Sequence, residues 1–134
     1  MFRKCLMVVR GVEDAKFLLK ILQALGFDGA IILTALDIAY LPTSKLVVSL
    51  PHAEWINDCL SILQQYSTNI ETKIIKYDGN TTPAELLTRL VKEESCDFIV
   101  VARRNPTQST GKNLVSSLAD LSPVPVMVIP YGVI

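Results

Sequence analysis

The sequence predicts a doubly wound α/β fold, in which helices cover both faces of a mostly parallel sheet. Short apolar runs alternate with helix-like segments from one end of the 134-residue chain to the other. Several runs, such as Cys5–Val9 and Phe98–Ala102, are continuously apolar, as in parallel strands that are buried on both faces. Five expected strands joined by four crossovers therefore favour a parallel sheet over an antiparallel one.

Length and composition describe one domain, residues 1–134, with enough apolar material for a core. Half of the residues (50%) are hydrophobic, which excludes a disordered chain. The 13 basic and 13 acidic side chains cancel, so the net charge argues for neither a nucleic-acid nor a membrane-surface partner. No apolar run approaches the roughly 18 residues of a membrane span.

The cysteines and the single histidine are expected to be structural. The chain has three cysteines, Cys5, Cys59 and Cys96, an odd number with no CxxC pair. Each lies in an apolar stretch, so we interpret them as buried thiols in a reducing cytoplasm. His52 has no clustered partner ligands, so no metal site is expected.

The first half of the chain is expected to form two strands and two helices. After the strand Cys5–Val9, a helix begins beyond Gly11 and ends at Gly26. Its apolar face contains Leu18, Ile21, Leu22 and Leu25. The second strand is residues 30–36, and residues 37–50 are interpreted as a loop with an apolar side. A second helix starts near Pro51, with one face made of Ile56, Cys59, Leu60 and Leu63.

The second half is expected to add three strands and two helices. Residues 72–77 alternate in polarity and are assigned to an edge strand. Thr82-Pro83-Ala84-Glu85 is a capping box with proline at the first helical position, and it predicts a helix start. The buried face that follows contains Leu86, Leu87, Leu90 and Val91, and that of the last helix Leu114, Val115, Leu118 and Leu121. Strands are expected at residues 98–102 and 126–129.

Three features together resemble the universal stress protein family over nearly the whole chain. Residues 82–101 are similar to the family's Pro-Ala-x-x-Ile helix followed by Asp-Leu-Ile-Val, and residues 122–129 to its closing Pro-Cys-Pro-Val-Leu-Val-Val. The third feature is the order of strands and helices at this length. The resemblance implies an adenine nucleotide alpha hydrolase-like (Rossmann-like) sheet of order 3-2-1-4-5. It also implies a homodimer, often made by the fifth strand, and in one branch ATP or AMP held between strands one and four.

The sequence departs from the family at that nucleotide site. The nucleotide-binding branch ends strand one with an aspartate that faces adenine, whereas this chain has Arg10-Gly11-Val12. After strand four, Ala102 and Asn105 stand at the first two glycine positions, and only Gly111 survives. Lys112 or Asn113 stands where the family has serine or threonine. The motif for ATP or AMP is therefore degenerate, and no cofactor is assigned from the sequence.

These replacements change how a ligand could be held. Glycine lets backbone N–H groups approach a phosphate, and Ala102 and Asn105 obstruct that approach. Cationic side chains in the same loop could contact an anion instead, whereas Arg10 cannot accept a hydrogen bond from an exocyclic amine. The candidate ligand-binding residues are Val9, Arg10, Gly11, Asp37, Ala102, Arg103, Arg104, Asn105, Gly111, Lys112 and Asn113.

Each candidate also has a plainer interpretation, which the residues alone favour. The 103–113 loop could be a solvated basic loop, and Arg10 with Asp37 a structural ion pair. His52 with Glu54 lacks a nucleophile, and the pair Ser116-Ser117 lacks a base, so no catalytic role is expected. Trp55 and Tyr66 are interpreted as packing or interface residues.

Three functions are compatible with these features. The first is a cytoplasmic, dimeric stress-response or regulatory domain with weak or altered nucleotide or anion binding. The second is a dimerisation or interaction module that binds no nucleotide. An ATP-hydrolysing enzyme is least favoured, because no P-loop and no metal-binding acid near a phosphate site are visible. The apolar segment Val124–Pro130 at the end of the sheet is the expected dimer edge, and no other protein partner can be named.

Overall fold

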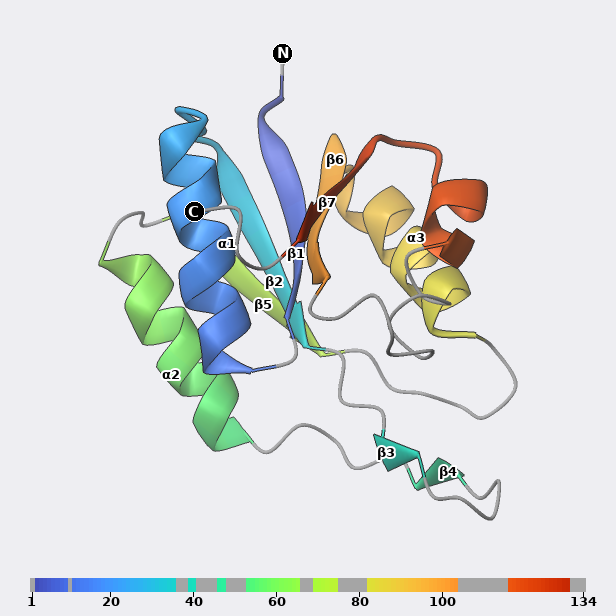
Figure 1. The fold of residues 1–134 in the computed structure, drawn as a ribbon, viewed down its shortest axis with the longest axis horizontal. Helices are drawn as coiled ribbons and strands as arrows, with labels where there is room; N and C mark the ends of the chain where they lie inside the picture. Colours follow the sequence, from blue (N-terminus) through green and yellow to red (C-terminus); the bar gives the residue numbers. More distant parts are fainter. Residues whose placement is uncertain are drawn as a thin grey trace.

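The central feature of the molecule is a five-stranded parallel sheet of order β5-β2-β1-β6-β7 (Figure 1). The structure is a computed structural model that describes residues 2–9, 11–35, 39–40, 46–47, 53–65, 69–74, 82–103 and 116–130. The strands are β1 (Lys4–Val9), β2 (Ala30–Ala35), β5 (Ile70–Ile74), β6 (Phe98–Arg103) and β7 (Val126–Pro130). Counted along the chain, β1, β2, β5, β6 and β7 are the first to fifth strands of this sheet, so their spatial order is 3-2-1-4-5. The predicted doubly wound α/β fold and the predicted strand order are both confirmed.

Helices cover both faces of the sheet, as Figure 1 shows. Helices α1 (Val12–Ala24) and α2 (Ala53–Gln64) lie on one face. Helix α3 (Pro83–Glu94) lies on the other, together with the helical residues 116–121. This arrangement explains why the central strands are apolar without alternation, since each residue meets a helix whichever way it points.

Neighbouring residues of a strand point to opposite faces of the sheet, so they belong to two different hydrophobic cores. The core beneath α1 and α2 takes Cys5, Met7 and Val9 of β1 with Phe98, Val100 and Ala102 of β6. The core beneath α3 takes Leu6 and Val8 of β1 with Ile99 and Val101 of β6. Because side chains alternate with a period of two, sliding β1 by one residue would exchange the two cores.

Helix α3 begins and ends with the caps that its sequence predicts. The Thr82 hydroxyl accepts a hydrogen bond of 3.2 Å from the Glu85 N–H, and Pro83 occupies the first turn, where a missing N–H costs nothing. At the other end Ser95 adopts a left-handed conformation with φ 54°, and the Cys96 N–H donates to the Val91 carbonyl. The buried face contains Leu87, Leu90 and Val91, as predicted, and also Ala84, whereas Leu86, predicted on the same face, is half-buried.

The amino-terminal segment is bound to the sheet by backbone hydrogen bonds and by aromatic contacts. One oxygen of Asp97 accepts from the N–H groups of Arg3 and Lys4, at 2.7 and 3.0 Å. The Phe98 ring contacts Phe2 and Phe27, with centroids 4.8 and 5.4 Å away. The segment before β1 is therefore part of the folded domain.

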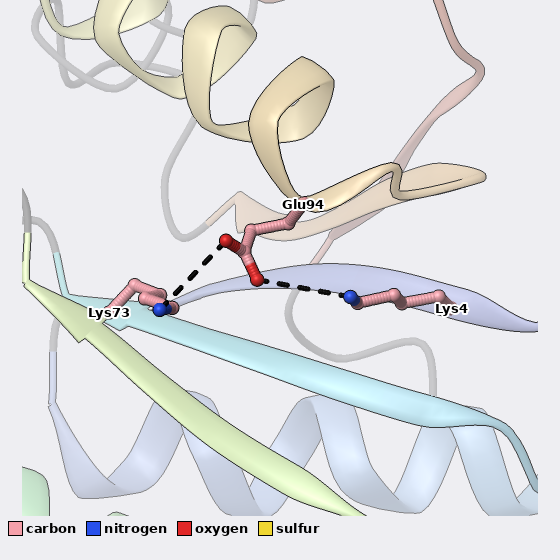
Figure 2. A network of polar contacts seen from close by, with 3 residues as sticks. All are labelled: Lys4, Lys73 and Glu94. Atoms are coloured by element: carbon pink, nitrogen blue, oxygen red, sulfur yellow. Dashed lines mark ion pairs between the residues drawn. The ribbon is translucent and has the colours of Figure 1, made fainter.

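A small ion-pair network joins α3 to two strands (Figure 2). The Glu94 carboxylate lies 3.8 Å from the Lys4 ammonium of β1 and 3.9 Å from the Lys73 ammonium of β5. Both distances are close to the limit for an ion pair, and Lys73 is 44% exposed. Each contact therefore contributes at most about 1 kcal/mol, so the network adds little to the stability of the fold.

Several local expectations were wrong. The helical periodicity predicts Leu25 and Leu121 on buried helix faces, but these side chains are 60% and 47% exposed. The edge strand β5 starts at Ile70, two residues before the expected Thr72. The segment 37–50, read as a loop, contains an antiparallel pair of two-residue strands, β3 (Ala39–Tyr40) and β4 (Leu46–Val47).

Candidate functional site

The candidate site lies at the carboxyl ends of β1 and β6, where the direction of strand order reverses. These two strands pair in parallel with Val8 opposite Val101, although 93 residues separate their first paired residues, Cys5 and Phe98. The chain leaves β1 into α1 on one face of the sheet, whereas the helical residues 116–121 that follow β6 lie on the other face. Connections that part in this way leave a crevice at the carboxyl edge in doubly wound folds.

Two of the candidate residues are packed into the core. Val9 and Ala102 are 1% and 4% exposed, and both belong to the core beneath α1 and α2. The methyl group of Ala102 therefore contributes packing on that face. By the alternation of β6, the next side chain, Arg103, lies on the α3 face, and it is exposed. Arg103 is thus an exposed cation at the carboxyl edge of the sheet, beside the switch point between β1 and β6.

Gly11 precedes α1 at the same edge of the sheet, and the space that a side chain at this position would take is open. Its φ of 175° is extended backbone that any residue adopts, and a Cβ atom there would meet nothing within 4 Å. The helix that follows has no side-chain cap, and its first turn carries Glu13 and Asp14. These carboxylates already complement the positive end of the helix dipole, so α1 offers an anion little additional attraction.

The remaining candidates, which include most of the basic loop, lie outside the described residues: Arg10, Asp37, Arg104, Asn105, Gly111, Lys112 and Asn113. The structure therefore brings together Val9, Gly11, Ala102 and Arg103 at one edge and gives no test of the others. His52, Glu54, Trp55 and Tyr66 also fall outside the side chains that the structure describes.

One polar residue near this edge was not singled out from the sequence. Thr34 of β2 is 0% exposed and lies between Val8 of β1 and Lys73 of β5 in the sheet register. Its hydroxyl has no hydrogen-bond partner, which is unusual for a buried polar group. The only signal in the sequence was a threonine within the apolar run of residues 31–35.

The thiols are unsuited to nucleophilic chemistry. Burial raises the pKa of Cys5 to about 12 and that of Cys59 to about 11, and burial also raises the pKa of Cys96. All three are unpaired and buried, as expected from the sequence. Among the described residues, no three His, Cys, Asp or Glu side chains gather in a way that could hold a metal.

The fold and its switch point are those of a doubly wound, Rossmann-like α/β protein, and the solved structures that resemble it include universal stress proteins. A universal stress protein in complex with cAMP matches with a TM-score of 0.66 at 15% identity, over 96% of this chain and 97% of that one. A family protein from Burkholderia pseudomallei matches with a TM-score of 0.66 at 14% identity, over 96% of each chain.

A third similar structure is a universal stress protein family protein from Arabidopsis thaliana with AMP bound. It has a TM-score of 0.65 and 16% identity, and the match covers 98% of this chain and 93% of that one. No model of a protein family matches the sequence, and no curated protein does. The shared fold thus extends over nearly the full length at low sequence identity. In the part of the chain that the structure describes, no helix is long and apolar enough to cross a membrane.

Proposed function

We propose that this protein is a cytoplasmic, non-catalytic regulatory domain of the universal stress protein type, which binds adenine nucleotides or other phosphate-bearing anions weakly. The observation that carries the proposal is the switch point between β1 and β6, in a fold shared with structures described as holding cAMP and AMP. Ligands of doubly wound proteins bind at that edge. Hydrolysis is not part of the proposal, because the sequence supplies no P-loop.

Weak binding follows from the charges and contacts at the edge. Arg103 is exposed and can donate to a phosphate through a planar fork. An exposed side chain has to lose rotamer freedom on binding, and water screens its charge. The acidic first turn of α1 opposes a second anion contact from the β1 side. These effects favour an affinity that is low and dependent on salt.

Calorimetry and thermal denaturation with AMP, cAMP, ATP with magnesium, and pyrophosphate test this proposal. A ligand at ten times its dissociation constant stabilises the folded state by about 1.4 kcal/mol, so millimolar ligand should produce a measurable shift. The shift should shrink as sodium chloride is raised. Tight, magnesium-dependent ATP binding would contradict the proposal, as would a complete lack of response to all four compounds.

A charge-matched pair of variants tests the role of the basic rim. Arg103→Ala with Arg104→Ala should abolish the ligand-dependent shift. Arg89→Ala with Lys92→Ala removes the same charge from the exposed side of α3 and should leave the shift intact. Equal ligand responses in the two double variants would exclude a side-chain mechanism at Arg103 and Arg104.

A second candidate function is a dimerisation module that binds no nucleotide, and the two edges of the sheet favour it. The edge strand β5 carries the exposed charges Glu71 and Lys73, a common protection against pairing. The opposite edge strand β7 carries no charge, and all five of its residues are partly exposed. We therefore propose a homodimer through β7, with or without a ligand.

Sedimentation of the wild type and of a charged variant tests the dimer. Met127→Lys with Val128→Asp places opposite charges on the two faces of β7 and should convert the dimer to a monomer. Glu71→Lys with Lys73→Glu changes the other edge strand to the same extent and should sediment as wild type. A wild-type monomer at tens of micromolar would refute the dimer. A dimer in spite of the β7 charges would move the interface elsewhere.

A further inference from the structure

The turn between α1 and β2 contains the dipeptide Asp28-Gly29, which takes no part in the candidate site at the carboxyl edge. Asp28 is exposed and lies outside both the helix and the strand. In the part of the chain that the structure describes, its carboxylate forms no ion pair or hydrogen bond, and the Gly29 N–H donates to no acceptor. A carboxylate and the amide that follows it are therefore adjacent and unengaged.

The other four aspartates among the described residues are held differently. Asp14, Asp58 and Asp120 lie in helices, where the hydrogen bonds of the helix fix the N–H of the next residue. The Asp97 carboxylate accepts from two backbone N–H groups, and the bulky Phe98 follows it. Of these five aspartates, that of the α1–β2 turn alone combines a non-helical backbone, an unengaged carboxylate and a neighbour without a side chain.

We propose that the Asp28–Gly29 bond is a modification site, at which isoaspartate forms spontaneously in the folded protein. The Gly29 amide nitrogen attacks the Asp28 Cγ atom, so a new C–N bond forms. The amide proton and the hydroxyl of the protonated carboxyl group leave together as water, and the product is a succinimide ring. Glycine favours this closure because it has no side chain to crowd the ring, and its backbone adopts the widest range of conformations.

Water then opens the ring at one of its two carbonyl carbons. Attack at Cγ restores aspartate. Attack at the main-chain carbonyl carbon of residue 28 breaks the bond of that carbon to the Gly29 nitrogen, so the main chain now passes through Cβ and Cγ, and the α-carboxylate becomes free. Isoaspartate therefore adds one carbon, about 1.5 Å, to the main chain between residues 27 and 29. Water is the only co-reactant of the two steps.

The added carbon falls where the backbone has little room. Gly29 packs so closely on Arg3 that a Cβ atom would overlap the Arg3 carbonyl oxygen, which also accepts from the Ala30 N–H at 2.8 Å. The same Cβ atom would lie 2.8 Å from the Phe27 ring, which packs against Phe98. A longer turn has to shift against Arg3 or pull Ala30 away from it. The modified protein should therefore lose stability at the amino edge of the sheet.

Peptide mapping of protein stored folded at neutral pH and physiological temperature tests the site. Trypsin places Asp28 on the peptide of residues 21–45. The sequence's other Asp-Gly pair, Asp78-Gly79, lies outside the described residues and falls on a separate peptide, residues 77–89. Electron-transfer fragmentation distinguishes isoaspartate from aspartate at each position. Isoaspartate should accumulate at residue 28 several-fold faster than at the other four described aspartates together.

Two variants at position 28 bracket the wild type. Asp28→Glu keeps the charge but would have to close a larger ring, so it should abolish the signal. Asp28→Asn closes the same succinimide with loss of ammonia, and its amide is not ionised at neutral pH, so it should raise the signal several-fold. A folded wild type without isoaspartate at residue 28, although the chain forms it in urea, would overturn the proposal, because the fold would then protect the bond.

Thermal denaturation of the stored samples tests the consequence. Wild type should melt at a lower temperature as its isoaspartate content rises, whereas stored Asp28→Glu should melt like its fresh sample. An isoaspartyl methyltransferase with S-adenosylmethionine esterifies the free α-carboxylate, and loss of methanol re-forms the succinimide, so this treatment should restore the melting temperature. An unchanged melting temperature in spite of accumulated isoaspartate would overturn the predicted effect on the amino edge.

Discussion

The carboxylate of Asp97 holds the backbone of Arg3 across 94 residues of sequence, with 2.7 Å between its Oδ2 atom and the Arg3 nitrogen. This hydrogen bond is the main reason that the pKa of Asp97 is lowered, and a second bond from the Lys4 N–H acts in the same direction. Only the ionised carboxylate accepts both bonds fully. The contact therefore ties the start of β1 to the start of β6 in a way that depends on pH.

Asp97→Asn should lower the melting temperature at pH 7, and the loss should fade in acid. Because the pKa is lower in the folded state, ionised Asp97 contributes stability above its unfolded pKa of about 4. That stability is lost as the pH falls through the lower folded value. Thermal denaturation from pH 7 to pH 2 measures the difference between variant and wild type.

Asp28→Asn is the matched control, since it removes an exposed carboxylate at the same end of the sheet. Its melting curves should follow those of wild type at every pH. A constant difference between Asp97→Asn and wild type over the whole range would show that the ionised carboxylate is not the cause.

Gly29→Ala should destabilise the fold by about 1–3 kcal/mol, the usual cost of overpacking. A Cβ atom at Gly29 would overlap the Arg3 carbonyl oxygen, a backbone atom that also accepts from the Ala30 N–H. Gly11→Ser should instead be neutral or add a few tenths of a kcal/mol by capping α1, because nothing lies within 4 Å of that position. Urea denaturation compares the two, and equal losses would refute the close approach at Gly29.

Ser95→Gly should stabilise the protein by roughly 0.5–1 kcal/mol, since glycine adopts a positive φ without steric cost. Ser95 has φ 54° at the end of α3, and it is exposed. Gly26→Ala is the converse test, because Gly26 has φ 75° with nothing within 4 Å of an added Cβ, so only the backbone conformation resists it. Chemical denaturation should give free energies of unfolding that change in opposite directions, and changes of the same sign would contradict this account.

Thr34→Val should stabilise the fold by about 1 kcal/mol, because it replaces a buried, unsatisfied hydroxyl with a methyl group of the same shape. Thr34→Ser keeps the hydroxyl and loses the methyl group, so it should destabilise by a similar amount. A destabilised Thr34→Val variant would mean that the hydroxyl has a hydrogen-bond partner in solution.

The three thiols should react slowly with iodoacetamide in the folded protein at pH 8. The thiolate is the reactive species, and the pKa values of about 12 for Cys5 and about 11 for Cys59 leave almost none of it. Mass spectrometry should find all three labelled rapidly in urea. Rapid labelling of Cys59 without denaturant would contradict the packing of α2.

The strands and the central helices could be predicted because each is fixed by its own residues. Continuous apolar runs identify β1 and β6, and the Thr82–Glu85 cap identifies the start of α3. The helix ends could not be predicted from periodicity alone. Leu25 has the right spacing, but it lies at the end of α1, and Phe27 reaches the core instead. Leu121 likewise ends its helix just before the turn into β7.

The candidate site was less accessible to sequence reasoning than the fold. The switch point follows from the strand order, and Val9, Gly11, Ala102 and Arg103 lie near it because β1 and β6 are neighbours. What a motif cannot indicate is which of two opposite faces a side chain takes. The motif predicts that Ala102 obstructs a phosphate, and the structure adds that its methyl group packs beneath α1 and α2.

The pairing of β1 with β6 sets the order in which the protein can mature during its synthesis. The surface formed by Leu6, Val8 and Ile32 is complete early, but the helices that cover it come from residues 83–94 and 116–121. At about 5–20 residues per second, the ribosome needs on the order of 10 seconds to supply that cover. Until then the nascent chain presents an apolar sheet face to its surroundings.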